Sequence, residues 1–397
     1  MNATGLLSGV RVLAVTQYGA GPYATQHLAD LGADVIKIEQ PGVGDYARAI
    51  PPYVAPDGAD SLFFQALNRS TRSVTLDLGV ADGQRVFRAL AAKSDAVITN
   101  LRPDAGKRLG LDYESLREVN PRLVCCWLTG FGRTGARASA SGFDYLLQAE
   151  SGIMSLAGDP DRLPAKAGVS IIDFAAGIAA AFATVSGILS ARARGIGCDT
   201  DVSLRDTAAS LLNYVATWHL SAGYQPERLA ASAHPSLVPS QLFACADQPI
   251  IVMVNKEHFW PRLAEAVGRP EWASAPDRAT FTDRLEHRER VVADLQAVFA
   301  TDTAERWLAR LQRHKVPSGP VRTVLEAFRD PEYAARTVSF EHPHFGAVTS
   351  PGPLVTNDTT GPARPAPALG EHTDEVLEHL AELSSREVQR LREAGVV

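Results

Sequence analysis

Apolar and polar positions follow two different periods along the first half of the chain. Short, almost continuous apolar runs, typical of strands buried on both faces, are separated by segments with the spacing of amphipathic helices. Strands are expected over residues 10–15, 34–38, 73–76, 96–99 and 123–128, with helices over 22–31 and 82–93. This alternation predicts βαβ units and a parallel sheet, so we expect an α/β protein with a Rossmann-like large domain.

The second half changes in composition after residue 224. Residues 225–249 are rich in Pro, Ser and Ala and are expected to be a connector or loop, and residues 346–367 an extended crossing. A helix is expected over 206–224, a strand over 250–254, and further helices over 257–267, 284–299, 303–313, 373–383 and 385–394. The expected organisation is a large domain beginning with residues 1–200, a linker helix over 201–224, a smaller α/β domain over 225–320, and a return segment over 321–397 that completes the large domain.

Composition excludes several classes of protein. The 397 residues are 45% hydrophobic and 21% charged, with a net charge of −6 and no basic stripe, so no nucleic-acid partner is expected. The four cysteines form no CxxC pair, which argues against a zinc site and favours a reducing compartment. The N-terminus lacks the features of a signal peptide, so we expect a cytoplasmic protein. His342 and His344 flank Pro343, but neither they nor the scattered other histidines predict a metal site.

The segment 174–191 has no charge over 18 residues and reaches the length of a membrane span. It is rich in Ala, Gly, Ser and Thr and is therefore only mildly apolar. Asp173 precedes it, and Arg192 and Arg194 follow it, as the dipole of a helix favours. We therefore expect a buried helix of a soluble protein and no membrane partner.

The turn after the first strand carries a dinucleotide-binding pattern. Gly19, Gly21 and Ala24 match G-x-G-x-x-A, and Glu39 ends the second strand about 20 residues later. A nicotinamide or flavin enzyme is therefore one interpretation, and a tight strand-to-helix turn is the other. Pro22 suits the start of a helix but removes a backbone donor that a pyrophosphate could use.

Candidate chemistry also lies elsewhere. Residues 68–73 precede an expected strand and residues 100–108 follow one, and both segments carry several basic residues. Basic residues at the carboxyl ends of strands suggest an anionic ligand, and a solvated turn is the other interpretation of 68–73. Neither G-x-S-x-G nor a P-loop occurs. Asp173, between Ile172 and Phe174, is either a helix N-cap or a nucleophile held away from water, and Asp144 could equally start a helix.

Several segments together resemble the class III CoA-transferases, the family that includes formyl-CoA and carnitine CoA-transferases. The resemblance spans nearly the whole chain. It is carried by residues 7–12 with the GAGP turn, and by the segments 31–45, 68–78, 100–113, 120–132, 193–208 and 367–377.

This resemblance implies that Asp173 is the nucleophile, followed by a glycine-containing helix with Gly177. The carboxylate would attack an acyl-CoA thioester and pass through a mixed anhydride to an aspartyl-CoA thioester. The helix N-terminus would keep the carboxylate ionised, backbone N–H groups near glycines would stabilise the oxyanion, and the site would exclude water. No metal, ATP or permanently bound cofactor is implied, because a coenzyme A thioester is itself the substrate.

The resemblance also implies the ligand contacts. The implied CoA contacts are Tyr18, Gly19, Ala20, Gln40, Leu76, Asn100, Leu101 and Arg108. Gln40 and Leu101 depart from basic or aromatic residues in some members, which predicts weaker adenine or phosphate contacts. Arg48 is a candidate for binding a second carboxylate of the substrate. The implied partners are acyl-CoA, a small carboxylic acid and a second copy of the chain in an interlocked homodimer.

The sequence leaves other functions open. The related α-methylacyl-CoA racemases pair His with Asp in a G-H-D segment, but Phe143 occupies the His position here, which leaves Asp144 as a possible second catalytic carboxylate. The chain lacks the tetraglycine loop of formyl-CoA:oxalate enzymes after residue 225. An NAD-dependent oxidoreductase using the Gly19 turn and a non-catalytic CoA-binding subunit are further alternatives.

Overall fold

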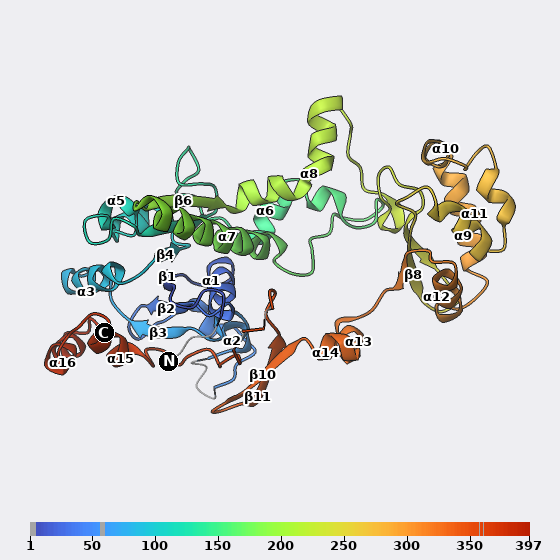
Figure 1. The fold of residues 1–397 in the computed structure, drawn as a ribbon. Helices are drawn as coiled ribbons and strands as arrows, with labels where there is room; N and C mark the ends of the chain where they lie inside the picture. The colour runs from blue at the N-terminus through green and yellow to red at the C-terminus, as the bar shows by residue number, and fades with distance from the viewer. Residues whose placement is uncertain (1–4, 56–59, 357, 360) are drawn as a thin grey trace. The chain divides into compact units, whose positions relative to one another are not determined.

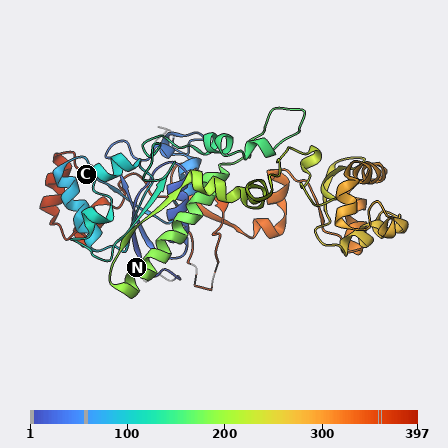
Figure 2. The same ribbon diagram turned by 90° about the horizontal axis from the view of Figure 1, so that it is seen from above.

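The computed structural model describes residues 5–55, 60–356, 358–359 and 361–397. The chain folds into two compact units (Figures 1 and 2). The first comprises Met1–Ser151, Gly168–Leu211 and Ala335–Val397, and the second comprises Gly152–Ala167 and Leu212–Ala334.

A six-stranded parallel sheet forms the centre of the first unit. Its strands are β1 (Arg11–Val15), β2 (Asp34–Glu39), β3 (Arg72–Thr75), β4 (Ala96–Thr99), β5 (Val124–Thr129) and β6 (Cys198–Ser203), and their order is β3-β2-β1-β4-β5-β6. This is the order of a doubly wound Rossmann sheet, so the α/β prediction is confirmed. The order reverses between β1 and β4, where such sheets bind ligands beyond the carboxyl ends of the strands.

Helices cover both faces of this sheet (Figure 1). Helices α1 (Ala20–Asp30) and α7 (Ile171–Arg194) pack on one face. They cross closely at Gly177, where a Cβ atom would lie 2.8 Å from the carbonyl oxygen of Ala20. On the other face, α3 (Ala81–Ala92), α15 (Thr373–His379) and α16 (Ser385–Glu393) share a hydrophobic core with the strands.

The C-terminal part of the first unit contains a hairpin that the sequence did not predict. Strands β10 (Thr337–His342) and β11 (Gly346–Pro351) pair in antiparallel fashion, and β11 lies within the segment 346–367 where an extended crossing was expected. His342 lies 3.2 Å from the carboxylate of Asp60, which connects the hairpin to the segment before α2 (Leu62–Asn68).

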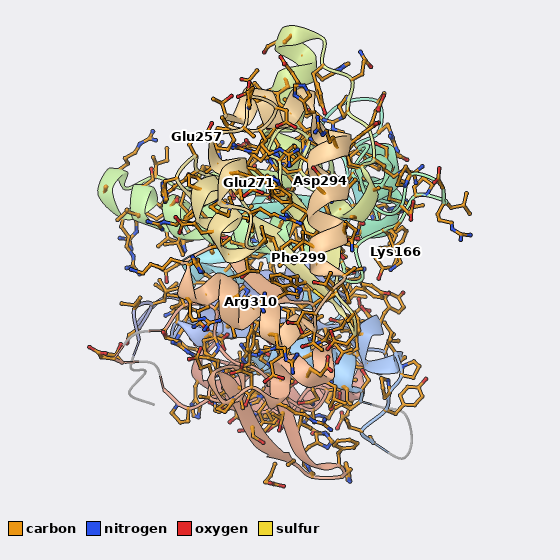
Figure 3. The ribbon with its side chains drawn as sticks, turned by 90° about the vertical axis from the view of Figure 1, so that its right-hand side faces the viewer. Lys166, Glu257, Glu271, Asp294, Phe299 and Arg310 are labelled. Atoms are coloured by element: carbon orange, nitrogen blue, oxygen red, sulfur yellow. The ribbon has the colours of Figure 1, made fainter. Side chains whose placement is uncertain are left out.

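The second unit is a three-stranded antiparallel sheet covered by helices. Its strands are β7 (Ser240–Ala244), β8 (Pro249–Met253) and β9 (Ser318–Pro320), and the main helices are α9 (Phe259–Ala266), α11 (Arg288–Phe299) and α12 (Ala304–Arg313). Phe299, labelled in Figure 3, is fully buried between the rings of Phe243 and Trp307. The expectation of a loop over 225–249 was therefore wrong for β7.

The long helix expected over 206–224 is interrupted. Helix α8 (Leu204–Ala222) has a non-helical residue, Asn213, with φ 34° and ψ −110°. The break lies next to the boundary between the two units at Leu211 and Leu212.

Helix α7 is buried on one face only. By length and composition it could cross a membrane, but Ile172, Ala176 and Ala180 on its inner face are fully buried. On its outer face, the side chains of Phe182 and Leu189 are 74% and 71% exposed. The prediction of a buried helix was therefore right only for the inner face.

Candidate active site

Asp173 lies in the first turn of α7, and Asp144 holds that turn in place. The N-cap of α7 is Ser170, so Asp173 is the third helical residue and the N-cap interpretation was wrong. Asp144, the first residue of α6 (Asp144–Glu150), accepts the backbone N–H groups of Ile172 at 2.7 Å and Asp173 at 3.0 Å. Its other oxygen accepts the side-chain amide of Gln148 at 2.5 Å. Asp144 is therefore a positioning residue whose oxygens are occupied, and not the second catalytic carboxylate that the sequence suggested.

Burial changes the acidity of the Asp173 carboxyl. The side chain is 9% exposed, and desolvation together with the nearby charge of Asp144 raises the pKa of Asp173 to about 7. The helix N-terminus was expected to keep this carboxylate ionised, but its pKa is raised, and the N–H groups of Ile172 and Asp173 in the first turn are donated to Asp144 instead.

The turn after β1 lies directly against Asp173. A Cβ atom on Gly19 would sit 3.0 Å from the carboxylate oxygen Oδ2 of Asp173, so only glycine leaves this space open. Tyr18 adopts φ 69°, and its N–H donates to Asp45 at 2.9 Å. The side chain of Asn100, just after β4, bonds both backbone groups of Gln17, at 2.9 Å and 2.7 Å. The turn is thus fixed from two sides.

Two buried ion pairs lie beneath this turn. Lys37 of β2 pairs with Asp45 at 2.7 Å and donates to the carbonyl oxygen of Thr16 at 2.8 Å. Arg48 forms a two-pronged pair with Glu39, at 2.9 Å and 2.8 Å. All four side chains are less than 9% exposed, so each charge depends on its partner for stabilisation.

The prediction that Arg48 binds a substrate carboxylate was wrong. Its guanidinium is 4% exposed, is bound to Glu39 and the carbonyl oxygen of Pro367, and stacks on the ring of Phe64. Because this guanidinium is buried and its charge is already paired with Glu39, it is not free to bind a carboxylate of the substrate.

A cavity of about 320 Å³ opens beside Asp173 at the carboxyl ends of β1, β4 and β5. Its lining comprises Gln17, Tyr18, Gly19, Ala20, Asn100, Leu101, Arg102, Pro103, Ala105, Leu128, Thr129, Gly130, Ala138, Ala140, Ser141, Gly142, Phe143, Asp173 and Leu204. Gly130 and Gly142 touch through their backbones here: a Cβ atom on Gly142 would lie 2.4 Å from the Cα of Gly130. We call this space the Asp173 cavity.

A second cavity of about 270 Å³ adjoins it. It lies at the carboxyl ends of β1, β2 and β3, and it shares Gln17 and Leu101 with the Asp173 cavity. Its walls include the apolar side chains of Ile38, Leu76 and Leu78. We call it the β2–β3 cavity.

Most of the predicted ligand contacts lie around these two cavities. Tyr18, Gly19, Ala20, Asn100 and Leu101 line the Asp173 cavity, and Gln40, Leu76 and Leu101 line the β2–β3 cavity. Arg108 is exposed at the end of α4 (Pro103–Arg108) and lines neither.

Sequence reasoning missed part of the wall. Gln17, Gly130 and Phe143 line the Asp173 cavity but were not proposed as site residues. Gln17 follows β1 and Gly130 follows β5, so their places after parallel strands were a usable signal. Phe143 does not follow a strand; its signal was its place at the His position of the related racemases, directly before Asp144.

The structure does not favour the dinucleotide interpretation of the Gly19 turn. A Cβ atom on Gly21 would meet Thr16 at 2.8 Å and Asn100 at 3.0 Å, so the protein itself fills the space that a pyrophosphate would need. Among the described residues, no group of three or more His, Cys, Asp or Glu side chains could hold a metal ion.

Comparison with known proteins agrees with this geometry. The chain matches CoA-transferase family III over residues 7–373 and belongs to that family. It is a CoA-transferase, which moves CoA between an acyl-CoA donor and a carboxylic acid acceptor.

Three similar proteins illustrate the relationship. The succinate–glutarate CoA-transferase of Agrobacterium fabrum is 36% identical over 94% of this chain and 95% of its own. The succinyl-CoA:mesaconate CoA-transferase of Haloarcula hispanica is 33% identical over 94% of this chain and 96% of its own. The crystal structure of a CAIB/BAIF family protein from Brucella suis has a TM-score of 0.80 and 33% identity, covering 95% of this chain and all of that one.

Proposed function

We propose that CoA transfer proceeds through a thioester on Asp173. The ionised carboxylate attacks the thioester carbon of the donor, the CoA thiolate leaves, and a mixed anhydride forms. The thiolate then attacks the Asp173 carbonyl carbon, which releases the donor acid and leaves an aspartyl-CoA thioester. The acceptor carboxylate attacks this carbon in turn and expels the thiolate, which completes transfer by attacking the acceptor's carbonyl carbon.

The observation that carries this proposal is the position of Asp173. It is a poorly solvated carboxylate at the wall of a cavity, within contact of the Gly19 turn. Poor solvation leaves the ionised oxygen reactive, and the low exposure of the site limits hydrolysis of the anhydride and the thioester. Gly19 is the N-cap of α1 and Ala20 is its first residue. The first N–H groups of this helix have no partner within it and are donors for the developing oxyanion.

The relatives suggest the substrates. The Agrobacterium enzyme is named for succinate and glutarate, and the Haloarcula enzyme for succinyl-CoA and mesaconate. All of these acids carry two carboxylates. We propose that the chain transfers CoA between two dicarboxylic acids, with succinyl-CoA as a donor.

The outer face of α7 supports a homodimer. Ile171, Ala175, Ile178, Phe182, Val185 and Leu189 repeat at alternating intervals of four and three residues. This is the spacing of a helix-packing seam, and Phe182 and Leu189 are its most exposed members. We propose that a second copy of the chain covers this stripe.

All four cysteines are free thiols in the structure, which is in keeping with a cytoplasmic location.

Substitution of Asp173 tests the proposal. Asp173→Ala and Asp173→Asn both remove the nucleophile, so transfer from succinyl-CoA to glutarate should fall to the uncatalysed level. Asp206→Asn, an exposed carboxylate on α8, is the matched control and should transfer normally. Transfer by the Asp173 variants at the wild-type rate would refute the mechanism.

A further inference from the structure

The β2–β3 cavity adjoins the Asp173 cavity and shares two of its lining residues. If the thioester lies at Asp173, the nucleotide end of CoA can reach past Gln17 and Leu101, which line both cavities. The β2–β3 cavity is also where a doubly wound sheet holds an adenosine, beyond β2 and β3. Its apolar walls, Ile38, Leu76, Leu78 and Leu109, suit a flat base.

The charges around this cavity do not suit a phosphate. Of the described residues that line it, Glu39, Asp45 and Asp77 are acidic and none is Lys or Arg. Glu39 and Asp45 are neutralised by Arg48 and Lys37, which lie behind them. Asp77 is different: one oxygen accepts the N–H of Gly79 at 2.8 Å, and it forms no ion pair with any residue that the structure describes.

We infer that the enzyme does not recognise the 3′-phosphate of CoA, and that Asp77 is the residue that sets this specificity. This inference rests on the proposed binding of acyl-CoA at Asp173. In dinucleotide sites of this fold, a carboxylate beyond β2 accepts ribose hydroxyls and disfavours a ribose phosphate, whereas an arginine accommodates the phosphate. Asp77 follows β3 and brings the same chemistry to the rim of the β2–β3 cavity. A ribose phosphate carries nearly two negative charges and gains no partner there.

The prediction concerns 3′-dephospho-CoA, which has a free hydroxyl at this position. The dissociation constants of CoA and 3′-dephospho-CoA, measured by calorimetry on the purified protein, should agree within about fivefold. The kcat/KM values of their succinyl thioesters should agree to the same extent. A preference for CoA greater than about fivefold in binding would overturn the inference.

Substitutions of Asp77 test its role directly. Asp77→Lys supplies a cation and should raise the preference for CoA by about tenfold or more, whereas Asp77→Asn should raise it less. Asp82→Lys, an exposed change on α3, is the control and should leave the ratio unchanged. Arg108 is the nearest rival as a phosphate partner, because it adjoins Leu109 of the cavity wall. Arg108→Ala should therefore leave the ratio of the two dissociation constants unchanged, and a change of that ratio in this variant would refute the role of Asp77.

The outcomes separate this inference from the proposed function. Equal binding of both ligands without transfer supports the inference and refutes the proposed reaction. Transfer with a strong requirement for the 3′-phosphate supports the reaction and refutes the inference. Failure to bind either ligand refutes both.

Discussion

Asp144 and Asp173 share the N-terminal end of α7: the carboxylate of Asp144 accepts the backbone N–H of Asp173 at 3.0 Å, and the side chain of Asp173 is left without those donors. The arrangement uses one carboxylate to hold the other. It fixes the helix turn that carries Asp173. Desolvation raises the pKa of Asp173, and the like charge of Asp144 raises it further. The nucleophile is thereby more basic than an ordinary aspartate.

The first prediction concerns pH. Because only the ionised Asp173 attacks the thioester and its pKa is about 7, kcat/KM for acyl-CoA should rise as pH increases through 7 and level off above it. Asp144→Asn keeps an oxygen for the two N–H groups but removes the like charge. The rise should then move to lower pH.

The matched control for this pH profile is Glu150→Gln. Glu150 lies at the other end of α6, where it pairs with Arg137 on the surface. Its loss should leave the profile in place. A profile in Asp144→Asn that matches the wild type would show that Asp144 does not influence Asp173.

The second prediction concerns the space at Gly19. Its φ of −108° lies outside the left-handed region that favours glycine, and Gly19→Ala places a Cβ 3.0 Å from the Asp173 carboxylate. Displacing the nucleophile by a fraction of an ångström should lower kcat by about 10- to 100-fold, with little change in the unfolding temperature. Gly168→Ala, where a Cβ meets nothing within 4 Å, is the control. Equal kcat in the two variants would contradict the contact.

The sequence predicted the central sheet well for a physical reason. Strands buried on both faces are nearly continuous apolar runs, and the expected strand over 96–99 coincides with β4. Strand β7 was missed because its polar residues, Ser240 and Gln241, are buried through neighbours that the local pattern does not reveal. The break at Asn213 also leaves no trace in the apolar spacing of α8.

The site was only partly predictable for a related reason. The resemblance identified Asp173, and the ends of parallel strands identified the region around it. The roles of Asp144 and Arg48 depend on contacts made in three dimensions: Asp144 bonds a residue 29 positions away, and Arg48 bonds the carbonyl of Pro367. Residue type alone could not distinguish a buried ion pair from a free cation at the site.

The third prediction concerns the buried pair beneath the Gly19 turn. Asp45→Ala leaves Lys37 charged and unpaired, and it also removes the acceptor for the Tyr18 N–H. The free energy of unfolding should fall by about 3–5 kcal/mol. Adding Lys37→Met should recover much of the lost free energy of unfolding, measured by urea unfolding, because it removes the unpaired buried charge. CoA-transfer activity should be low in both the single and the double variant, because the Tyr18 N–H lacks its acceptor in each. Full recovery of activity would contradict the positioning role of Asp45.

The fourth prediction concerns the stripe on α7. Phe182→Glu places a charge on its most exposed residue, so light scattering after size exclusion should show monomer where the wild type shows dimer. Leu6→Glu, at another exposed apolar residue of the first unit, should remain dimeric. A monomeric wild type would refute the proposed dimer, and a dimeric Phe182→Glu would place its interface elsewhere.

The most direct measurement of the central claim is mass spectrometry of the protein after incubation with succinyl-CoA in the absence of an acceptor acid. The account predicts that the peptide carrying Asp173 gains the mass of CoA less one water, and that glutarate removes this adduct while glutaryl-CoA appears. Asp144→Asn should still form the adduct, and Asp173→Asn should not. Glutaryl-CoA formed at full rate by a protein that never carries CoA on Asp173 would contradict the account.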